Sequence, residues 1–450
     1  MTSPERTAAP TTASRHQVPG RLLLAAAVCL GSFAAFWITQ RLVGVTLLDV
    51  MVYRAEGLTV RNGGDLYAMQ ATVAKLPTTY PPFAALLFTP LTLLGIPEMR
   101  TFATGFNLLL VLALAYLALR LTGVEERVKR LAPALFVAAA LVWCEPVWTT
   151  LRYGQINLLL AVLVLWDLTR RADHRWAGVG IGLAAAIKLT PALFAVMLAL
   201  AGIATAVRRI RAGRPWWNSH LRRAVTAAAT FLVVTLASAV VLPYDSKRFW
   251  TEVVFSADRP GQIEDTANQS LRGVLARLLH TTDPGLWWVG AAAVVAVCGL
   301  ALAVRSLLLG RTAWAVTACA VTALLISPVS WSHHWVWAVP VLMLLAAEVR
   351  RRGGRALRAG TGAVAAVFFS YSLWWVPHAG TSTTVRPELD QNVLELLLSA
   401  GYVLAGLGFL AYVALSAGSA ATTDADGPSP GTTPGREASG HVPVQARAKE

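Results

Sequence analysis

The stretch RLLLAAAVCLGSFAAFWIT at residues 21–39 carries one charged side chain, at its first position, and decides the class of fold. Its length suits the roughly 30 Å hydrocarbon core of a bilayer. It ends in bulky Phe36-Trp37-Ile38 and no small-residue cleavage site follows, so we interpret it as an uncleaved membrane helix rather than a signal peptide.

Comparable apolar runs recur along most of the chain, and they predict an all-α polytopic membrane protein with about 12 membrane helices, including short or broken ones. The remaining candidate segments are 82–96, 101–120, 131–149, 155–169, 177–207, 223–243, 285–307, 312–327, 334–349, 359–376 and 393–415.

The composition supports the same class. The chain has 450 residues, of which 56% are hydrophobic and 14% charged, whereas about a quarter of a soluble protein's residues are charged. The net charge of +15 lies mostly in arginines beside helix ends, which the positive-inside bias explains without any nucleic-acid partner. The expected environment is therefore the lipid bilayer of the plasma membrane.

The four cysteines all fall within apolar runs and lack metal-ligand spacing, so we expect neither a disulfide framework nor a zinc site. No cofactor and no metal are expected. Segments 1–18 and 417–450 are rich in Ala, Thr, Ser, Pro and Gly and are predicted to be disordered tails, leaving 19–416 as one membrane domain.

Two topologies fit the apolar runs. If 82–96 crosses fully and 177–207 is one long helix, the basic gaps 121–130 and 170–176 fall outside. If 82–96 dips into or lies on the outer face and 177–207 breaks near Pro191, every basic gap is cytoplasmic. We favour the second topology, in which both termini are cytoplasmic and the gaps with chemically interesting residues face outward.

Asp49 directly follows the first helix, in Leu47-Leu48-Asp49-Val50. Apolar surroundings disfavour the charged form of a carboxyl, which suits a general base. The alternative is an ordinary interfacial acid that caps a short helix.

Lys188 is a lysine inside a membrane run, next to Pro191. A buried ammonium in lipid is costly, so we expect it to face a cavity or an anion such as phosphate. The alternative is a lysine that extends its ammonium to the membrane interface.

His333 and His334 stand between Ser327 and Trp337 in a loop joining two membrane segments. Paired histidines can donate to phosphate oxygens or relay a proton near neutral pH, while the neighbouring tryptophans also fit an interfacial belt.

Arg152 and Gln155 precede the 155–169 segment, and Asn268 and Arg272 close a long outer loop. Arginine suits bidentate contact with phosphate, and amide side chains suit hydrogen bonds to an oxygen-rich ligand. The alternative is that these groups only cap helices.

The order of these motifs resembles glycosyltransferase family 87, the actinobacterial polyprenol-phosphate-mannose-dependent α-1,2-mannosyltransferases. The resemblance covers roughly residues 20–415. After Asp49 it rests on Gly63-Gly64-Asp65-Leu66-Tyr67, Tyr80-Pro81-Pro82-Phe83, Gly154-Gln155-Ile156-Asn157, Lys188-Leu189-Thr190-Pro191, Asn268-Gln269-Ser270 and the 327–337 loop.

The resemblance implies a GT-C glycosyltransferase fold whose active site faces away from the cytoplasm. It implies inverting transfer of mannose from a polyprenyl-phosphate sugar donor to a glycolipid or lipoglycan acceptor, with Asp49 as the catalytic base. Lys188, His333 and His334 are then the first candidates for stabilising the leaving phosphate, followed by Arg152 and Arg272. A transporter or flippase for lipid-linked sugars is the alternative, since it also needs a cavity, a buried lysine and broken helices.

Overall fold

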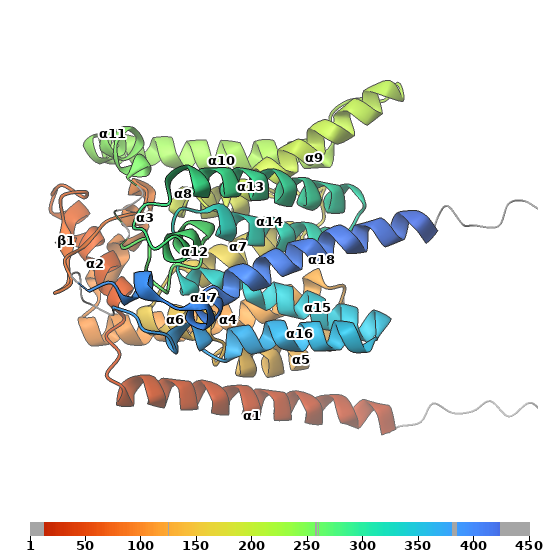
Figure 1. Cartoon of the computed structure of the whole chain (residues 1–450), viewed down its shortest axis with the longest axis horizontal. Coiled ribbons are helices and arrows are strands. Elements are labelled where there is room, and N and C mark those ends of the chain that lie inside the picture. The colour runs from red at the N-terminus through yellow and green to blue at the C-terminus, as the bar shows by residue number, and fades with distance from the viewer. Residues whose placement is uncertain (1–12, 125, 257–258, 260, 380–384, 424–450) are drawn as a thin grey trace, which may run out of the picture.

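The computed structural model describes residues 13–124, 126–256, 259, 261–379 and 385–423. In this part of the chain the fold is helical, apart from one antiparallel hairpin formed by β1 (Gln70–Ala71) and β2 (Leu76–Pro77). The long helices run along the long axis of the molecule (Figure 1). The helical membrane fold predicted from the sequence is confirmed.

Five helices are long and apolar enough to cross a membrane within the described residues, or up to seven if each of two bent pairs forms one span. The expected number of about twelve is therefore not confirmed. The five are α1 (Ala13–Leu42, apolar from Gly20), α4 (Ile96–Leu121), α9 (Ala192–Arg211), α10 (Ser219–Val241) and α13 (Gly285–Leu308).

The bent pairs are α5 (Arg127–Leu141) with α6 (Glu145–Tyr153), and α17 (Val393–Ser399) with α18 (Gly401–Thr423). The other elements are α2 (Leu48–Arg61), α3 (Pro82–Phe88), η1 (Thr89–Leu93), α7 (Asn157–Leu168), α8 (Val179–Ile187), α11 (Pro243–Thr251), η2 (Val253–Phe255), α12 (Leu271–Leu278), α14 (Thr312–Ile326), η3 (Ser332–Trp337), α15 (Ala338–Arg352), α16 (Arg355–Phe369), η4 (Ser372–Trp374) and η5 (Pro387–Asp390).

Two predicted features of the favoured topology are present. The 82–96 segment forms the short helices α3 and η1 and then enters α4, and the 177–207 segment is broken between Ile187 and Ala192. Lys188, in the break, has extended backbone with φ −150° and ψ 132°. Helices α1 and α18 extend a few residues into the segments expected to be tails, and the rest of those tails lies outside the described residues.

Two of the candidate membrane segments are sharply bent. The 131–149 run turns by 76° between α5 and α6. Pro146 lies in the first turn of α6, where its missing N–H costs no helical hydrogen bond, so a helix begins there readily.

The 393–415 run bends by 67° between α17 and α18. The freed carbonyl of Ser399 accepts hydrogen bonds from Gln269 Nε2 at 2.6 Å and Arg277 Nη2 at 3.0 Å. Side chains distant in sequence thus satisfy a backbone group that the bend leaves without a helical partner.

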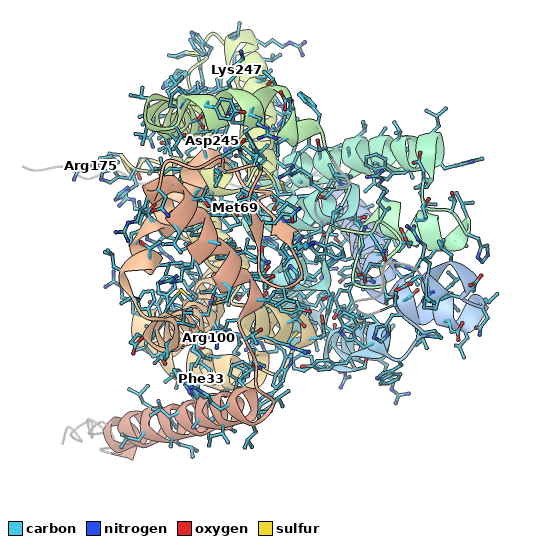
Figure 2. The ribbon with its side chains drawn as sticks, turned by 90° about the vertical axis from the view of Figure 1, so that its left-hand side faces the viewer. Phe33, Met69, Arg100, Arg175, Asp245 and Lys247 are labelled. Carbon is cyan, nitrogen blue, oxygen red and sulfur yellow. The ribbon has the colours of Figure 1, made fainter. Side chains whose placement is uncertain are left out.

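The bundle has two different ends. One, which we call the loop end, gathers the β-hairpin, α2, α3, α6 and α11 (Figure 1). Figure 2 views the molecule from this end, with Asp245 and Lys247 of α11 on one side, Met69 near the middle and Arg100 of α4 on the other side. Helices α4, α7 and α9 all begin near the loop end and run away from it.

The fully buried Glu145 joins four segments at the loop end. Its Oε1 accepts hydrogen bonds from Thr149 Oγ1 at 2.7 Å, Ser332 Oγ at 2.9 Å and Trp374 Nε1 at 3.0 Å. Its Oε2 accepts from the Tyr402 hydroxyl at 2.6 Å. One carboxyl therefore connects α6 with η3, η4 and α18.

We expect Glu145→Ala to destabilise the fold by roughly 3 kcal/mol, because a buried donor that loses its acceptor retains its desolvation cost. Glu145→Gln should cost less, since it keeps one oxygen acceptor. The measurement is the thermal unfolding midpoint in detergent micelles, with exposed Glu126→Ala as the matched control. Equal midpoints for Glu145→Ala and Glu126→Ala would contradict the prediction.

Candidate active site

Helix α2 presents a row of polar side chains on one face. Asp49 lies in its first turn, and Tyr53 and Glu56 follow four and seven residues later, which places all three on the same side of a helix. Two cavities meet at this face, one of about 690 Å³ and one of about 210 Å³. Asp49, Gln155 and Trp331 line both.

Gln155 is held in one orientation by two tyrosines. Its Oε1 accepts hydrogen bonds from the hydroxyls of Tyr53 at 2.9 Å and Tyr80 at 3.1 Å. With the oxygen engaged, the amide nitrogen is the donor left for the carboxylate of Asp49, whose pKa the Gln155 side chain lowers.

Gly154 allows the turn that carries Gln155 to lie close to α2. Gly154 ends α6 in the left-handed region, with φ 71° and ψ 33°. A Cβ atom on Gly154 would lie 2.2 Å from Cγ2 of Val50, the residue after Asp49. The turn that carries Gln155 therefore packs against α2 only because residue 154 has no side chain.

The pKa of Asp49 is shifted toward neutrality. Asp49 belongs to α2, which is not one of the membrane-spanning helices. Burial raises the pKa of Asp49 to about 6. The Gln155 hydrogen bond and the charge of Lys188 act in the opposite direction and lower this pKa. At neutral pH the group is ionised and has a pKa suited to accepting a proton.

The smaller cavity brings Lys188 and His334 together. Nδ1 of His334 accepts a hydrogen bond from the backbone N–H of Trp331 at 3.1 Å, so the neutral ring carries its hydrogen on Nε2. This Nε2 lies 2.9 Å from Lys188 Nζ. Lys188 Nζ also donates to Asn157 Oδ1 at 3.4 Å. In the contact between Lys188 and His334 one of the two nitrogens donates to the other, and an anionic oxygen that enters between them can accept a hydrogen from each.

The larger cavity contains His333 and an aromatic wall. His333 is buried, and its Nε2 has no hydrogen-bond partner within the described residues. Its ring meets Tyr153 edge-on with the ring centroids 5.6 Å apart. Arg152, at the end of α6, also lines this cavity. The other lining residues include Asp265, Trp331, Tyr371, Trp374 and His378.

The structure does not bring all the predicted site residues together. Asp49, Lys188, His333, His334, Arg152 and Gln155 surround the two cavities. The side chain of Asn268 is bonded instead to backbone, with Oδ1 accepting from the Ser330 N–H at 3.0 Å. Arg272 lies over the ring of Trp288 at 4.9 Å and lines neither cavity.

Glu56 was not anticipated from the sequence. It is fully buried and lines the smaller cavity with Asp49. Burial raises the pKa of Glu56 to about 8, and the charge of Asp49 adds to the rise, so its carboxyl is protonated at neutral pH. Its spacing of seven residues from Asp49 was the one available signal, and it is a weak one.

These features define a helical membrane protein with a polar cavity site that holds a carboxylate beside cationic and aromatic groups. Residues 79–328 match the model of glycosyltransferase family 87, which is more than half of the chain. The chain belongs to this family and is a glycosyltransferase.

Two relatives of this chain share one kind of donor in their names. The chain is 34% identical, over 75% of its length and 78% of the relative, to the polyprenol-phosphate-mannose-dependent alpha-(1-2)-phosphatidylinositol mannoside mannosyltransferase of Mycobacterium tuberculosis. It is 32% identical, over 69% of each chain, to the polyprenol-phosphate-mannose-dependent alpha-(1-2)-phosphatidylinositol pentamannoside mannosyltransferase of the same species. Among solved structures, ArnT from Cupriavidus metallidurans bound to undecaprenyl phosphate aligns over 90% of this chain and 78% of its own, at 16% identity and a TM-score of 0.43.

We expect Gly154→Ala to lower transferase activity about tenfold or more, because an added methyl group pushes the Gln155 turn away from Val50 and strains a left-handed residue. The measurement is initial rate at matched protein levels. Gly123→Ala is the control, because Gly123 also has positive φ but a Cβ there meets nothing within 4 Å. Loss of rate in the control alone would contradict the prediction.

Proposed function

We propose that this chain transfers mannose from polyprenyl-phosphate mannose to a hydroxyl of a lipid-linked acceptor, with inversion and formation of an α-1,2 linkage. The acceptor class is a phosphatidylinositol mannoside, lipomannan or a similar glycan. The observation that carries the proposal is the position of Asp49 at the junction of two cavities, with Lys188 and His334 lining one of them. The names of the relatives support the sugar and the acceptor class.

In this mechanism the acceptor oxygen attacks the anomeric carbon of the mannosyl phosphate while Asp49 takes the hydroxyl proton. The bond between the anomeric carbon and the phosphate oxygen breaks, and polyprenyl phosphate leaves from the opposite face of the sugar. The leaving phosphate gains a negative charge, which the neighbouring donors of Lys188 and His334 stabilise. No general acid is required, because the leaving group need not be protonated.

The larger cavity is suited to the acceptor. Trp331, Trp374 and Tyr371 offer aromatic faces and edges to apolar surfaces of a glycan, and Arg152 and His333 offer donors to its oxygens. Asp49 is shared by both cavities, so a hydroxyl in the larger cavity lies on the side of the base opposite the donor phosphate.

The distribution of arginines supports an active site that faces away from the cytoplasm. Helices α4, α9 and α15 have Arg120, Arg208 and Arg350 in their last turns, away from the loop end. The start of α1 and the end of α18 also lie at the end of the bundle opposite the loop end (Figure 1). By the positive-inside bias both termini are cytoplasmic and the loop end is outside.

Asp49→Asn should reduce mannosyl transfer by about a hundredfold or more, because the amide cannot accept the proton. Membranes holding either chain at equal expression would receive polyprenyl-phosphate mannose and a membrane lipid extract. Binding of the donor should persist in the variant, and exposed Asp283→Asn should behave as wild type. Undiminished transfer by Asp49→Asn would exclude Asp49 as the base, and transfer of another sugar only would exclude the mannosyl donor.

The rate at limiting substrate should fall as pH drops through about 6, since Asp49 acts only when ionised and its pKa is raised to about 6. The donor phosphodiester does not titrate in this range. Gln155→Leu should move the midpoint to higher pH, because the hydrogen bond that lowers the pKa of Asp49 is lost. A flat profile between about pH 5 and 7 would contradict the assignment.

A further inference from the structure

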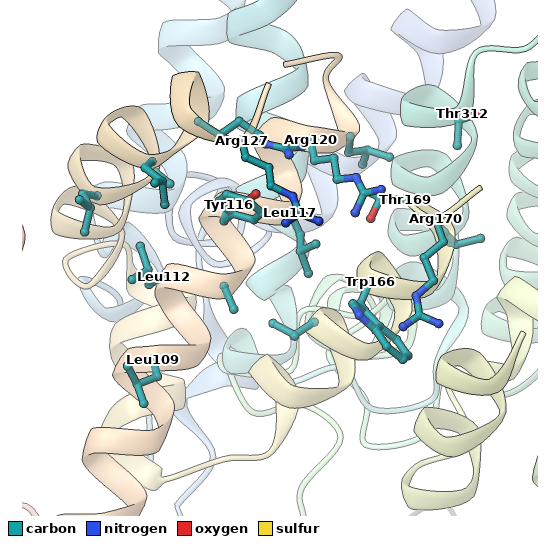
Figure 3. Close-up of a pocket in the computed structure, with 18 of the residues that line it drawn as sticks. Leu109, Leu112, Tyr116, Leu117, Arg120, Arg127, Trp166, Thr169, Arg170 and Thr312 are labelled. Carbon is teal, nitrogen blue, oxygen red and sulfur yellow. The ribbon is translucent and has the colours of Figure 1, made fainter. Parts of the chain in front are cut away.

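A large cavity lies at the end of the bundle opposite the loop end. Its volume is about 1130 Å³, and it opens between α4, α5 and α7 near the start of α14 (Figure 3). Five arginines line it and none of its described lining residues is acidic. They are Arg120, Arg127, Arg130, Arg170 and Arg171.

Arg130 is a buried cation that forms no ion pair with a described residue. Its side chain is 3% exposed, and its Nε and Nη1 have no hydrogen-bond partner within the described residues. The guanidinium lies over the ring of Tyr116 at 4.6 Å. Burial of an unpaired charge is costly, and the ring recovers only part of that cost, so an anion in the cavity would stabilise this arrangement.

Arg170, two residues after the end of α7, is a second, partly buried arginine that stacks on an aromatic ring. Its guanidinium lies over the ring of Trp166 at 3.1 Å, and its Nη1 has no hydrogen-bond partner in the described structure. The nearby carboxylate of Asp167 is already engaged, since it accepts hydrogen bonds from the N–H groups of Gly178 at 2.7 Å and Ile181 at 3.0 Å. Within the described part of the chain, Arg171 is the one of the five arginines with an ion pair, to Asp173 at 3.0 Å.

The cavity is amphipathic. Arg120, Arg127 and Arg170 lie in the upper and right-hand part of the view in Figure 3, while Leu109 and Leu112 lie at the left, nearer the start of α4. The apolar part of the lining continues with Leu117, Leu131, Ala134, Leu135 and Val162. Leu109 and Leu131 are exposed on the surface of the bundle, so the apolar wall opens toward lipid.

We propose that this cavity binds the phosphate of an anionic lipid in the leaflet opposite the active site, with Arg130 and Arg170 as the principal ligands. Basic pockets between membrane helices are suited to phosphate head groups, and the leucine wall accommodates the hydrocarbon chain. The chemistry recognised is a phosphate joined to a lipid tail, either a glycerophospholipid or a polyprenyl phosphate. The site does not overlap the cavities around Asp49 and does not depend on the proposed transfer reaction.

The test is retention of lipid by the purified full chain, measured by native mass spectrometry and by the thermal unfolding midpoint. The probes are phosphatidylglycerol, undecaprenyl phosphate, phosphatidylcholine and inorganic phosphate. We expect one or both anionic lipids to be retained and to raise the midpoint, and the stronger of the two identifies the source of the phosphate. Phosphatidylcholine and inorganic phosphate should have much smaller effects.

The double variant Arg130→Gln with Arg170→Gln should weaken retention about tenfold or more, because two charge-assisted contacts are lost. Arg208→Gln is the matched control, since Arg208 is an exposed arginine at the same end of the bundle. If removal of buried Arg130 prevents folding, Arg120→Gln with Arg127→Gln provides a second pair. Equal retention by wild type and both pairs, equal loss in the control, or an equal effect of inorganic phosphate would each overturn the proposal.

Discussion

The buried carboxyl of Glu145 is the interaction on which the arrangement of the candidate site depends. It accepts four hydrogen bonds, from α6 itself and from η3, η4 and α18. Because η3 carries His333 and His334, the same carboxyl that joins these segments also fixes both imidazoles relative to Asp49. In a bilayer the alternative partner, water, is scarce, so a buried acceptor of this kind selects one arrangement of the surrounding helices.

The sequence predicted the helical class and much of the site for a shared physical reason. Charged groups such as Lys188 and Asp49, within or beside long apolar runs, are tolerated only where they face a cavity or a partner, so their convergence was expected. The bends of α5–α6 and α17–α18 were not predictable in this way. Their freed backbone groups are satisfied by side chains such as Gln269 and Arg277, which are more than a hundred residues away from Ser399 in the sequence.

Polarity alone also failed to separate residues that face a cavity from those that support the backbone. Asn268 and Glu56 are both fully buried. Asn268 bonds to the Ser330 N–H and the Ile263 carbonyl, whereas Glu56 lines the smaller cavity. The difference lies in which loops pack beside each residue, and no local pattern around either position encodes that packing.

Trp331 is shared by the two cavities around Asp49. Its side chain lines both of them, and its backbone N–H donates to His334, the imidazole beside Lys188. A ligand that shifts Trp331 in the larger cavity also changes how His334 presents its hydrogen in the smaller one. If acceptor and donor occupy the two cavities as proposed, their affinities would be linked through Trp331, and by thermodynamic reciprocity each substrate would alter the binding of the other by the same factor.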